Sequence, residues 1–270
     1  MKIISFNINS IRVRLHQVEA LIDKHDPDVI GFQETKVIDE DFPYEAIKEM
    51  GYHPHVHGQK GYHGVALITK KKPSAIIKGF KTDTEDSQKR FISCSIKKGK
   101  KSIHILNGYF PQGEERNHPL KFPYKQKFYK DLIIHLKENY KPDDHLIVMG
   151  DLNISPEDID IGIGEENKKR WLRTGKCSFL PEEREMLSNL TSWGLVDSYR
   201  TIHPKKDDLF SWFDYRSKGF NDTPKRGLRI DHIWVTENLN KCLEEVGIDY
   251  DIRGMEKPSD HAPIWSTFKF

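Results

Sequence analysis

Short apolar runs that end in polar side chains recur along the chain, and they predict buried strands whose ends carry chemistry. The clearest case is HLIVMGDLNISP at residues 145–156, whose apolar run is typical of a buried strand. The run stops at Gly150, and Asp151 and Asn153 follow two residues apart. Side chains two apart on an extended chain point the same way. We therefore expect Asp151 and Asn153 to emerge together at the carboxyl end of a strand, where α/β proteins commonly bind ligands.

Other stretches repeat this construction. They are IISFNIN at 3–9 with Asn7 and Asn9, DVIGFQE at 28–34 with Glu34, LRIDHIWV at 228–235 with Asp231, and PSDHAPIW at 258–265 with Asp260 and His261. A carboxylate inside an apolar strand is costly without a partner. One such strand end alone would be read as a solvated Asx turn. Repeated acidic, amide and imidazole groups instead favour a site for a hard cation and a phosphate.

Hydrophobic periodicity assigns most of the remaining chain. Helices are predicted over 14–25, 43–50, 121–140, 182–193 and 237–244, and strands over 2–8, 28–33, 63–70, 74–79, 90–97, 102–109, 145–151, 228–235, 246–252 and 263–269. The strands within 63–109 form a meander that interrupts the strand–helix alternation, so the sheets are expected to be mixed. No linker or low-complexity segment is visible. The pattern predicts a single α/β domain over 1–270, with two packed sheets that share one cleft.

Composition narrows the class of protein. Hydrophobic residues make up 36% of the 270 residues, charged residues 31% and aromatic residues 11%, which is typical of a folded chain with a polar surface. No window approaches the ~18 apolar residues of a membrane span, and no signal or transit peptide is visible, so a cytoplasmic protein without membrane contact is expected. Cys94, Cys177 and Cys242 show no CxxC spacing and are expected to be reduced and structural. With a net charge of only +2, any phosphate binding must come from local patches.

The polar strand ends mainly supply oxygen ligands, which suit Mg²⁺ or Mn²⁺. A cation among such carboxylates would relieve their repulsion, polarise a phosphoryl oxygen and stabilise a leaving oxyanion. Asp151 beside Asn153 suits a general base next to a transition-state donor, and Asp231 suits a carboxylate that orients His261. A separate alternation of histidines could bind a transition metal if it lay on one strand face, but no fourth ligand is apparent, so an exposed strand is preferred. These histidines are His53, His55 and His57.

Longer motifs resemble a known family. Residues 2–268 resemble bacterial exonucleases of the exonuclease III family, in the endonuclease/exonuclease/phosphatase superfamily, through SFNIN, GFQETK, GQKGYHGVALITK, NGYFPQGEERNHPLKFPYK, MGDLNISPEDIDIGIGEENKKRWLRTGKCSFLPEER, FSWFDYRSKGF, LRIDHIWV and EKPSDHAP. The resemblance implies a four-layered, DNase I-like α/β sandwich with two mixed sheets flanked by helices. It also implies a monomeric, Mg²⁺-dependent enzyme, with Mn²⁺ able to substitute. Its expected substrate is duplex DNA: incision 5′ to abasic sites, 3′–5′ exonuclease action and removal of 3′ phosphates.

The resemblance also implies residue roles. Tyr109 would contact the scissile phosphate, Asp151 would activate water, and Asn153 would stabilise the transition state. Asp231 would orient the catalytic His261. The implied metal set is Asn7, Glu34, Asp151, Asn153, Asp260 and His261, with Glu34 as the main ligand.

Two clusters of cations and aromatic side chains are the predicted DNA contacts. The first, KKRWLRTGK at 168–176, surrounds Trp171, and the second, FSWFDYRSKGF, leads into further cations up to Arg229. A charge run is ordinarily only a solvated face, but the interleaved aromatics and the resemblance favour a DNA backbone. The expected contacts are Lys168, Lys169, Arg170, Arg173, Trp212, Phe213 and Arg216. Trp212 and Phe213 are predicted to shape a pocket for a base-free deoxyribose, with Phe210 in the core.

Small departures from the family pattern concern substrate preference. Ser10 stands where glycine commonly follows the asparagine pair, the loop 221–226 is about two residues longer than expected, and Tyr62-His63 is inverted against one common version. Two alternatives stay open at this stage. One is a phosphodiesterase or phosphatase of the same superfamily that acts on RNA, inositol phosphates or phospholipid head groups, and the other is a DNA-binding module without catalysis.

Overall fold

The strands with polar ends lie at the centres of two six-stranded sheets. The computed structural model describes all residues from 1 to 270. The first sheet has the order β11 (Leu243–Ile248), β12 (Ile264–Phe268), β1 (Lys2–Asn7), β2 (Val29–Gln33), β4 (Val65–Thr69) and β3 (His53–His57). The second has the order β5 (Ala75–Lys78), β6 (Phe91–Lys98), β7 (Lys101–Tyr109), β8 (His145–Asp151), β10 (Asp231–Thr236) and β9 (Leu195–Asp197).

Strand pairing brings the polar ends to one edge of the sandwich. In the first sheet β1 runs parallel to β2 and antiparallel to β12. In the second sheet β8 runs parallel to β7 and antiparallel to β10, and the register places Asp151 beside both Tyr109 and Asp231. Both sheets are therefore mixed, as the sequence predicted.

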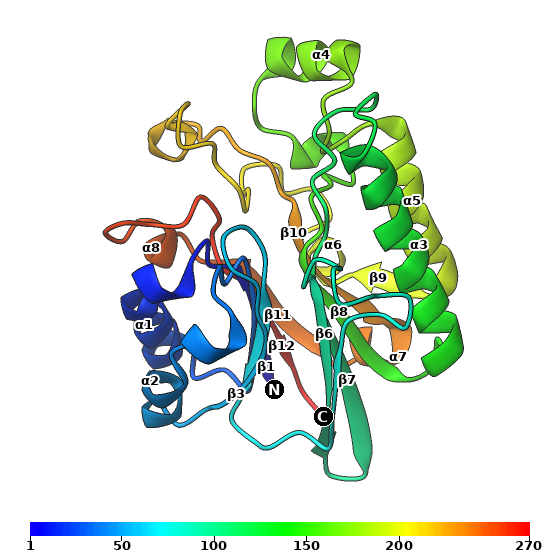
Figure 1. Cartoon of the computed structure of the whole chain (residues 1–270). Coiled ribbons are helices and arrows are strands. Elements are labelled where there is room, and N and C mark those ends of the chain that lie inside the picture. The colour runs from blue at the N-terminus through cyan, green and yellow to red at the C-terminus, as the bar shows by residue number, and fades with distance from the viewer.

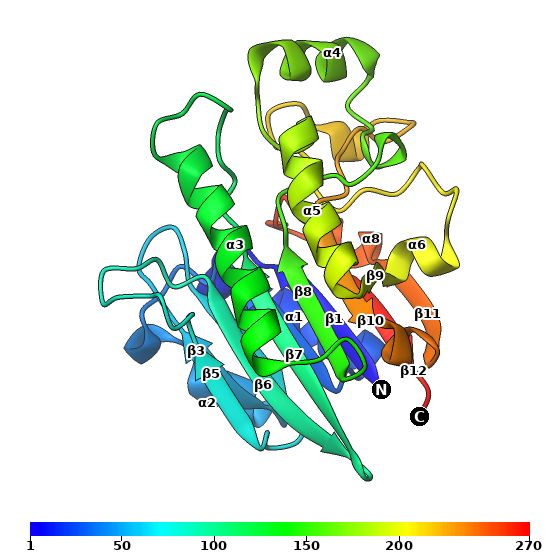
Figure 2. The same cartoon turned by 90° about the vertical axis from the view of Figure 1, so that its right-hand side faces the viewer.

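Helices cover both outer faces, which confirms the predicted four-layered sandwich. The first sheet is covered by α1 (Leu15–His25) and α2 (Tyr44–Glu49), and the second by α3 (Lys121–Asn139) and α5 (Pro181–Trp193). Figure 2 shows α3 and α5 side by side across the strands of the second sheet. None of the helices has both the length and the hydrophobicity needed to span a bilayer.

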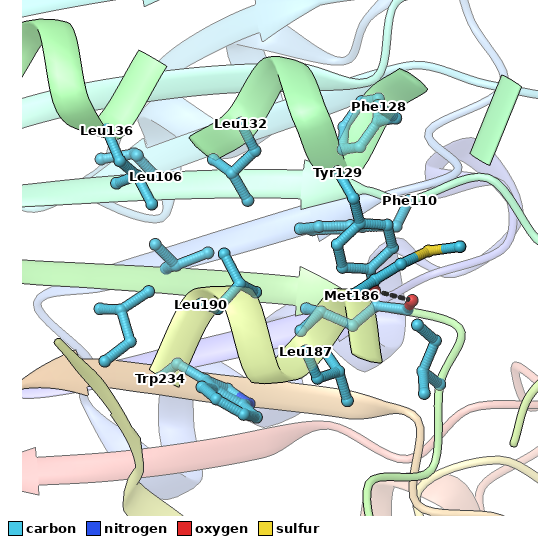
Figure 3. Packing of buried hydrophobic residues seen from close by; sticks show 14 of the residues in the cluster. Leu106, Phe110, Phe128, Tyr129, Leu132, Leu136, Met186, Leu187, Leu190 and Trp234 are labelled. Atoms are coloured by element: carbon cyan, nitrogen blue, oxygen red, sulfur yellow. Dashed lines mark hydrogen bonds between the residues drawn. The ribbon is translucent and has the colours of Figure 1, made fainter. Parts of the chain in front are cut away.

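The α3 and α5 layer follows from the spacing of apolar residues. In α3, Leu132 and Leu136 lie one turn apart and are buried, and in α5 Leu187 and Leu190 are also one turn apart and buried. Figure 3 shows these leucines turned toward the strands. Helix α5 begins at Pro181, a residue that suits the first turn of a helix because it has no N–H to leave unpaired.

One polar bridge crosses the apolar interior between the sheets. The side chain of Asn107, on β7, donates to the backbone carbonyls of Phe32 (3.0 Å) and Ala66 (3.1 Å) in the first sheet. Its oxygen accepts a hydrogen bond from Gln33 Nε2 at 2.6 Å. A buried amide with all these partners satisfied fixes how one sheet sits on the other.

Several predicted elements differ in their bounds. The helix predicted over 237–244 is only α7 (Glu237–Asn240), and the strand predicted over 246–252 is β11, which begins and ends earlier. The strand ends early because the Asp249 side chain accepts hydrogen bonds from the backbone of Asp251 and Ile252, which starts α8 (Tyr250–Arg253). Helix α6 (Ser198–Ile202) and short 3₁₀ turns at Ile11–Val13, Asp39–Asp41, Asp158–Asp160 and Gly219–Asn221 complete the chain.

Helix α4 (Glu165–Thr174) was not predicted, and it stands beyond the sandwich at the end where the polar strand ends gather (Figure 1). Glu165 and Glu166 occupy its first turn, where the helix dipole favours negative charge. Gly175 ends it in a left-handed conformation, with φ of 73°. The yellow-to-orange segment between α6 and β10 stands beyond the same end (Figure 1).

Candidate functional site

Asn7 joins the two sheets at the floor of the site. Its side-chain nitrogen donates to Glu34 Oε1 and to Asp151 Oδ2, both at 2.9 Å. Glu34 follows β2 and Asp151 ends β8, so one amide draws carboxylates from both sheets together. The structure therefore brings the ends of β2 and β8 together, as predicted.

Three side chains form a group that can hold a cation. One possible ligand atom each from Glu34, Asp151 and His261 lies within 4.8 Å of the others. Burial raises the pKa of Asp151, and the nearby carboxylates of Asp231 and Glu34 add to this, although His261 opposes it. A divalent cation would relieve the repulsion between these two close carboxylates, so the donor set fits a hard metal ion.

A buried carboxylate holds the imidazole of His261. Asp231 Oδ2 lies 2.8 Å from His261 Nδ1, and His261 Nε2 lies 3.8 Å from Asp151 Oδ2. Burial would lower the pKa of His261, but the carboxylates of Asp231 and Asp151 outweigh it, and the pKa is raised. The ring is therefore held as a cation that faces Asp151.

The backbone around the site adopts conformations that are uncommon for these residue types. Glu34 and Asn153 have φ values of 51° and 55°, in the left-handed region, and such strain collects at functional sites. The backbone N–H of Asn153 donates to Asp151 Oδ1 at 3.0 Å, and its side-chain nitrogen donates to Phe110 O at 2.9 Å. Just before Asp151, a Cβ on Gly150 would lie 1.9 Å from Gly108 O, so this close approach of β7 and β8 requires glycine.

Tyr109, which only the family resemblance identified, reaches the same site from the end of β7. Burial raises its pKa far above the ordinary value, helped by Glu34, so the hydroxyl stays protonated and can donate. Arg90, which sequence reasoning missed, stacks on the ring with its guanidinium 4.4 Å from the centroid. Lys36, also missed, lies 3.0 Å from Glu34 Oε2.

A cleft of about 350 Å³ opens above these groups. Many of the site residues predicted from the sequence line this cleft: Glu34, Tyr109, Asp151, Asn153, Trp212, Arg216, Asp260 and His261. Trp171 of α4 lines it as well, and so does Lys176, whose ammonium lies 3.9 Å from the centroid of the Trp171 ring. Asp231 lies behind His261 and does not line the cleft.

Asp260 lies in the cleft but outside the metal-binding group. Its two carboxylate oxygens accept hydrogen bonds from Asn9 Nδ2 (2.9 Å) and Trp212 Nε1 (3.0 Å). Burial would raise its pKa, yet His261 and these hydrogen bonds lower it overall. In this structure Asp260 orients Trp212, a contact that the sequence pattern did not indicate.

The predicted pocket role of Phe213 is wrong. Its side chain is fully buried and packs against the rings of Phe220 and Tyr250, with centroids 5.1 and 5.7 Å away. Trp212 and Phe213 point to opposite sides of an extended segment, so only Trp212 faces the cleft. Phe210 is buried, as expected.

The basic cluster on α4 is only partly free. Lys168 forms an ion pair with Asp158 at 2.8 Å, Lys169 lies 3.8 Å from Glu165, and Arg170 donates to Asn167. Arg173 is exposed and makes no side-chain hydrogen bond or ion pair, so it remains available to a phosphate.

Arg229, expected among the cations that contact the DNA backbone, is buried instead. Its guanidinium pairs with Asp160 at 2.6 Å and with Asp197 at 2.7 Å. The arginine is buried because these two carboxylates neutralise it. Either the guanidinium or the carboxylates would be costly to bury alone.

Comparison with known proteins places this geometry in a family. The model of the endonuclease/exonuclease/phosphatase family matches residues 4–261. Exodeoxyribonuclease III of Haemophilus influenzae is 58% identical over 269 residues and covers 100% of both chains. A DNA-(apurinic or apyrimidinic site) endonuclease of Dictyostelium discoideum is 30% identical, over 98% of this chain and 69% of its own length.

Solved structures agree with the sequence relatives. An AP endonuclease from Archaeoglobus fulgidus superposes with a TM-score of 0.90 at 32% identity, and a 3′ phosphatase from Neisseria bound to a product DNA hairpin does so with a TM-score of 0.90 at 34% identity. Each superposition covers 100% of this chain and 100% of the solved chain. With its fold, its site and its full-length relatives in agreement, the chain belongs to the endonuclease/exonuclease/phosphatase family and, within it, to the exonuclease III group.

Proposed function

We propose that the chain is a metal-dependent DNA repair nuclease that hydrolyses phosphodiester bonds as an exodeoxyribonuclease III and AP endonuclease. In this role it incises the strand 5′ to an abasic site and removes nucleotides and phosphates from 3′ ends of duplex DNA. The observation that carries the proposal is the group of Glu34, Asp151 and His261 at the floor of a cleft large enough for a nucleotide.

Glu34 and Asp151 would hold the ion, Asn7 keeps the two carboxylates in place, and the protonated His261 lies beside them. Mg²⁺ fits best because it prefers oxygen ligands, and Mn²⁺ can substitute. When bound, the ion polarises a phosphoryl oxygen and offsets charge on the leaving oxygen.

The remaining chemistry belongs to side chains of this chain. Asp151 takes a proton from the attacking water, and the Asn153 backbone N–H keeps the carboxylate oriented. His261, held as a cation by Asp231, and the protonated hydroxyl of Tyr109 point donors at the charge that develops on the phosphate. The Asn153 side chain uses one N–H on Phe110 O and keeps the other for the same purpose.

The rims of the cleft bind the DNA. Lys176 and Arg216 line the cleft and face the backbone, and Arg173 extends the contact along α4. Trp212, oriented by Asp260, forms the wall of a pocket that accepts a base-free deoxyribose. The DNA hairpin bound to the related Neisseria phosphatase supports a nucleic acid substrate over a lipid or inositol phosphate.

The test is incision of a duplex with one abasic site, with Mg²⁺ or with excess EDTA. We expect incision only with the metal, and Glu34→Gln should remove most activity and raise the Mg²⁺ concentration needed for half-maximal rate. Asp39→Asn, which changes a carboxylate outside the cleft, serves as the control. Full activity of the wild type in EDTA, or an unchanged Mg²⁺ requirement in Glu34→Gln, would contradict the proposal. Duplexes with plain 3′ ends, 3′ phosphates or an RNA strand, assayed alongside, rank the activities.

A further inference from the structure

A second pocket lies beside the cleft and contains a buried arginine without a partner. It has a volume of about 210 Å³ and is lined by Asp214, Lys218, Phe220, Asn221 and Arg253, among others. Asp214 lines both this pocket and the cleft, so the two hollows are neighbours that share a wall.

Arg253 ends α8 and is only 5% exposed. Its guanidinium makes no hydrogen bond or ion pair with the protein, and its buried Nε has no acceptor. The other buried arginines and lysines have acceptors: Arg229 pairs with Asp160 and Asp197, and Lys125 with Glu183. Arg90 has no ion pair but donates to the Gln88 side chain and to the Tyr109 carbonyl. A buried guanidinium without an anion is costly, which is why such groups are normally paired.

Aromatic rings hold the guanidinium in place without satisfying its donors. Its central carbon lies 4.6 Å from the centroid of Phe220 and 5.6 Å from that of Phe213. Stacking of this kind engages the face of the guanidinium plane and leaves the in-plane N–H groups unused. Burial lowers the pKa of Arg253, as expected for a charge that lacks a counter-ion.

The other polar groups of the pocket are also mainly donors. Lys218 is exposed, lies in a left-handed conformation (φ of 51°) and has no ion-pair partner. The Asn221 side chain makes no hydrogen bond within the protein. The one acid in the lining, Asp214, already accepts a hydrogen bond from the backbone of Arg216 at 2.9 Å. The pocket therefore offers a fork of donors and an exposed ammonium to an anion.

We infer that this pocket, which we call the Arg253 pocket, binds a backbone phosphate of the DNA strand that flanks the reacting nucleotide. The inference rests on the proposed function. A phosphodiester matches the planar fork of a guanidinium. Since the pocket adjoins the cleft, a strand that leaves the cleft over Asp214 brings regularly spaced phosphates past it. Arg253 thus acts as an additional DNA contact that positions the strand.

The experiment uses abasic-site duplexes in which one phosphate at a time is replaced by a neutral methylphosphonate. Binding is measured in EDTA for the wild type, for Arg253→Gln and for Lys218→Gln. Lys137→Gln, which loses the same charge on α3, is the matched control. In the wild type, neutralising the contacted phosphate should weaken binding about tenfold, the effect of one charge-assisted hydrogen bond. Arg253→Gln should abolish the penalty at that position alone and reduce the salt slope of binding by about 0.9.

An identical methylphosphonate profile in wild type and Arg253→Gln would overturn the inference and leave Arg253 as a packing residue. If Arg253→Gln does not fold, Lys218→Gln carries the test, because its side chain is exposed, and an unchanged profile there counts equally against the inference. Inorganic phosphate is titrated separately while the Arg253 Nε–H resonance is followed by NMR. A shift with phosphate but none with duplex would assign the pocket to free phosphate and overturn the DNA contact. Mg²⁺-dependent incision by the wild type is measured in parallel, since its absence alone would refute the proposed function.

Discussion

At the scale of single residues, Asp151 is held by contacts from several parts of the chain. It accepts hydrogen bonds from the Asn7 side chain and the Asn153 backbone, faces His261 and is 1% exposed. These contacts leave no freedom of rotation, as a proton acceptor that acts on one fixed water requires.

Asp151→Asn keeps the shape of the side chain and removes the proton acceptor. The incision rate should fall by about 10²–10⁴-fold, the usual contribution of a general base, while the fold stays intact. Single-turnover kinetics on an abasic duplex measure the effect, and circular dichroism checks the fold. A rate within a few-fold of the wild type would show that another group takes the proton.

Trp212 lines the cleft, whereas its sequence neighbour Phe213 is buried in the core. Substituting each in turn therefore separates an effect on the cleft from an effect on stability. Trp212→Ala should reduce discrimination between abasic and intact duplex and leave the Mg²⁺ requirement unchanged, because the side chain lines the cleft. Phe213→Ala should instead lower the free energy of unfolding by about 3–5 kcal/mol, the cost of truncating a fully buried phenylalanine. Discrimination assays and chemical denaturation separate the two outcomes. Wild-type discrimination in Trp212→Ala would place the sugar pocket elsewhere.

Site residues could be predicted where a polar side chain marked a strand end, even when the partner lay elsewhere in the chain, as for Asp231 and His261. Asp151 and Asn153 both line the cleft as predicted, but a turn places Asn153 there: its backbone is left-handed and its N–H donates to Asp151 Oδ1. The partners of Asp260 could not be found this way, because Asn9 lies 251 residues away and Trp212 lies 48 away. The same holds for Arg229, whose basic neighbours indicated a DNA contact and whose buried partner Asp160 lies 69 residues away.

At the scale of elements, α4 shows where periodicity fails. Trp171 is its only buried residue, so the helix has no apolar stripe for a pattern to reveal. The sandwich helices were predictable because they bury a full face, as α3 does. A helix with one anchored side chain and an unpaired cation, Arg173, suits binding to a partner more than packing in the core.

Neutralising Lys168, Arg170 and Arg173 together should flatten the salt dependence of DNA binding by about 0.9 for each phosphate that these side chains no longer bind. Arg173 should account for most of the change, because Lys168 is already paired with Asp158. Binding of an abasic duplex over a series of salt concentrations measures the slope, and Lys130→Gln on α3 is the control. An unchanged slope would show that α4 is only solvated.

At the scale of the whole molecule, distant parts of the chain are tied by a buried ion pair outside the site. Asp249, before α8, lies 2.6 Å from His25 Nε2 and 3.0 Å from Lys24 Nζ, at the end of α1. Burial alone would raise the pKa of Asp249, but the hydrogen bonds from His25 and Lys24 lower it to about 2. The folded-state pKa thus lies below the unfolded value of 3.8, so the stability it contributes is present above about pH 4 and is lost as the pH falls toward 2.

Asp249→Asn should therefore be less stable at neutral pH by up to about 2 kcal/mol, a figure reduced in practice because Lys24 is partly exposed. The difference from the wild type should shrink as the pH falls from 4 to 2. Chemical denaturation across this range provides the measurement. A constant difference at every pH would show that the substitution acts through the α8 cap and not through the charge.

The placement of β1 governs when the protein becomes active during synthesis. This first strand lies between β2 and β12, so its antiparallel partner is made near the other end of the chain. His261 and Asp260 come just before β12, hence a nascent chain carries Glu34 and Asp151 long before it carries the imidazole that completes the site. Contacts so far apart in sequence also make folding slow. We therefore expect a ribosome-bound fragment that ends before β12 to be unable to cut nucleic acid, with hydrolysis beginning only after translation has passed the last strand.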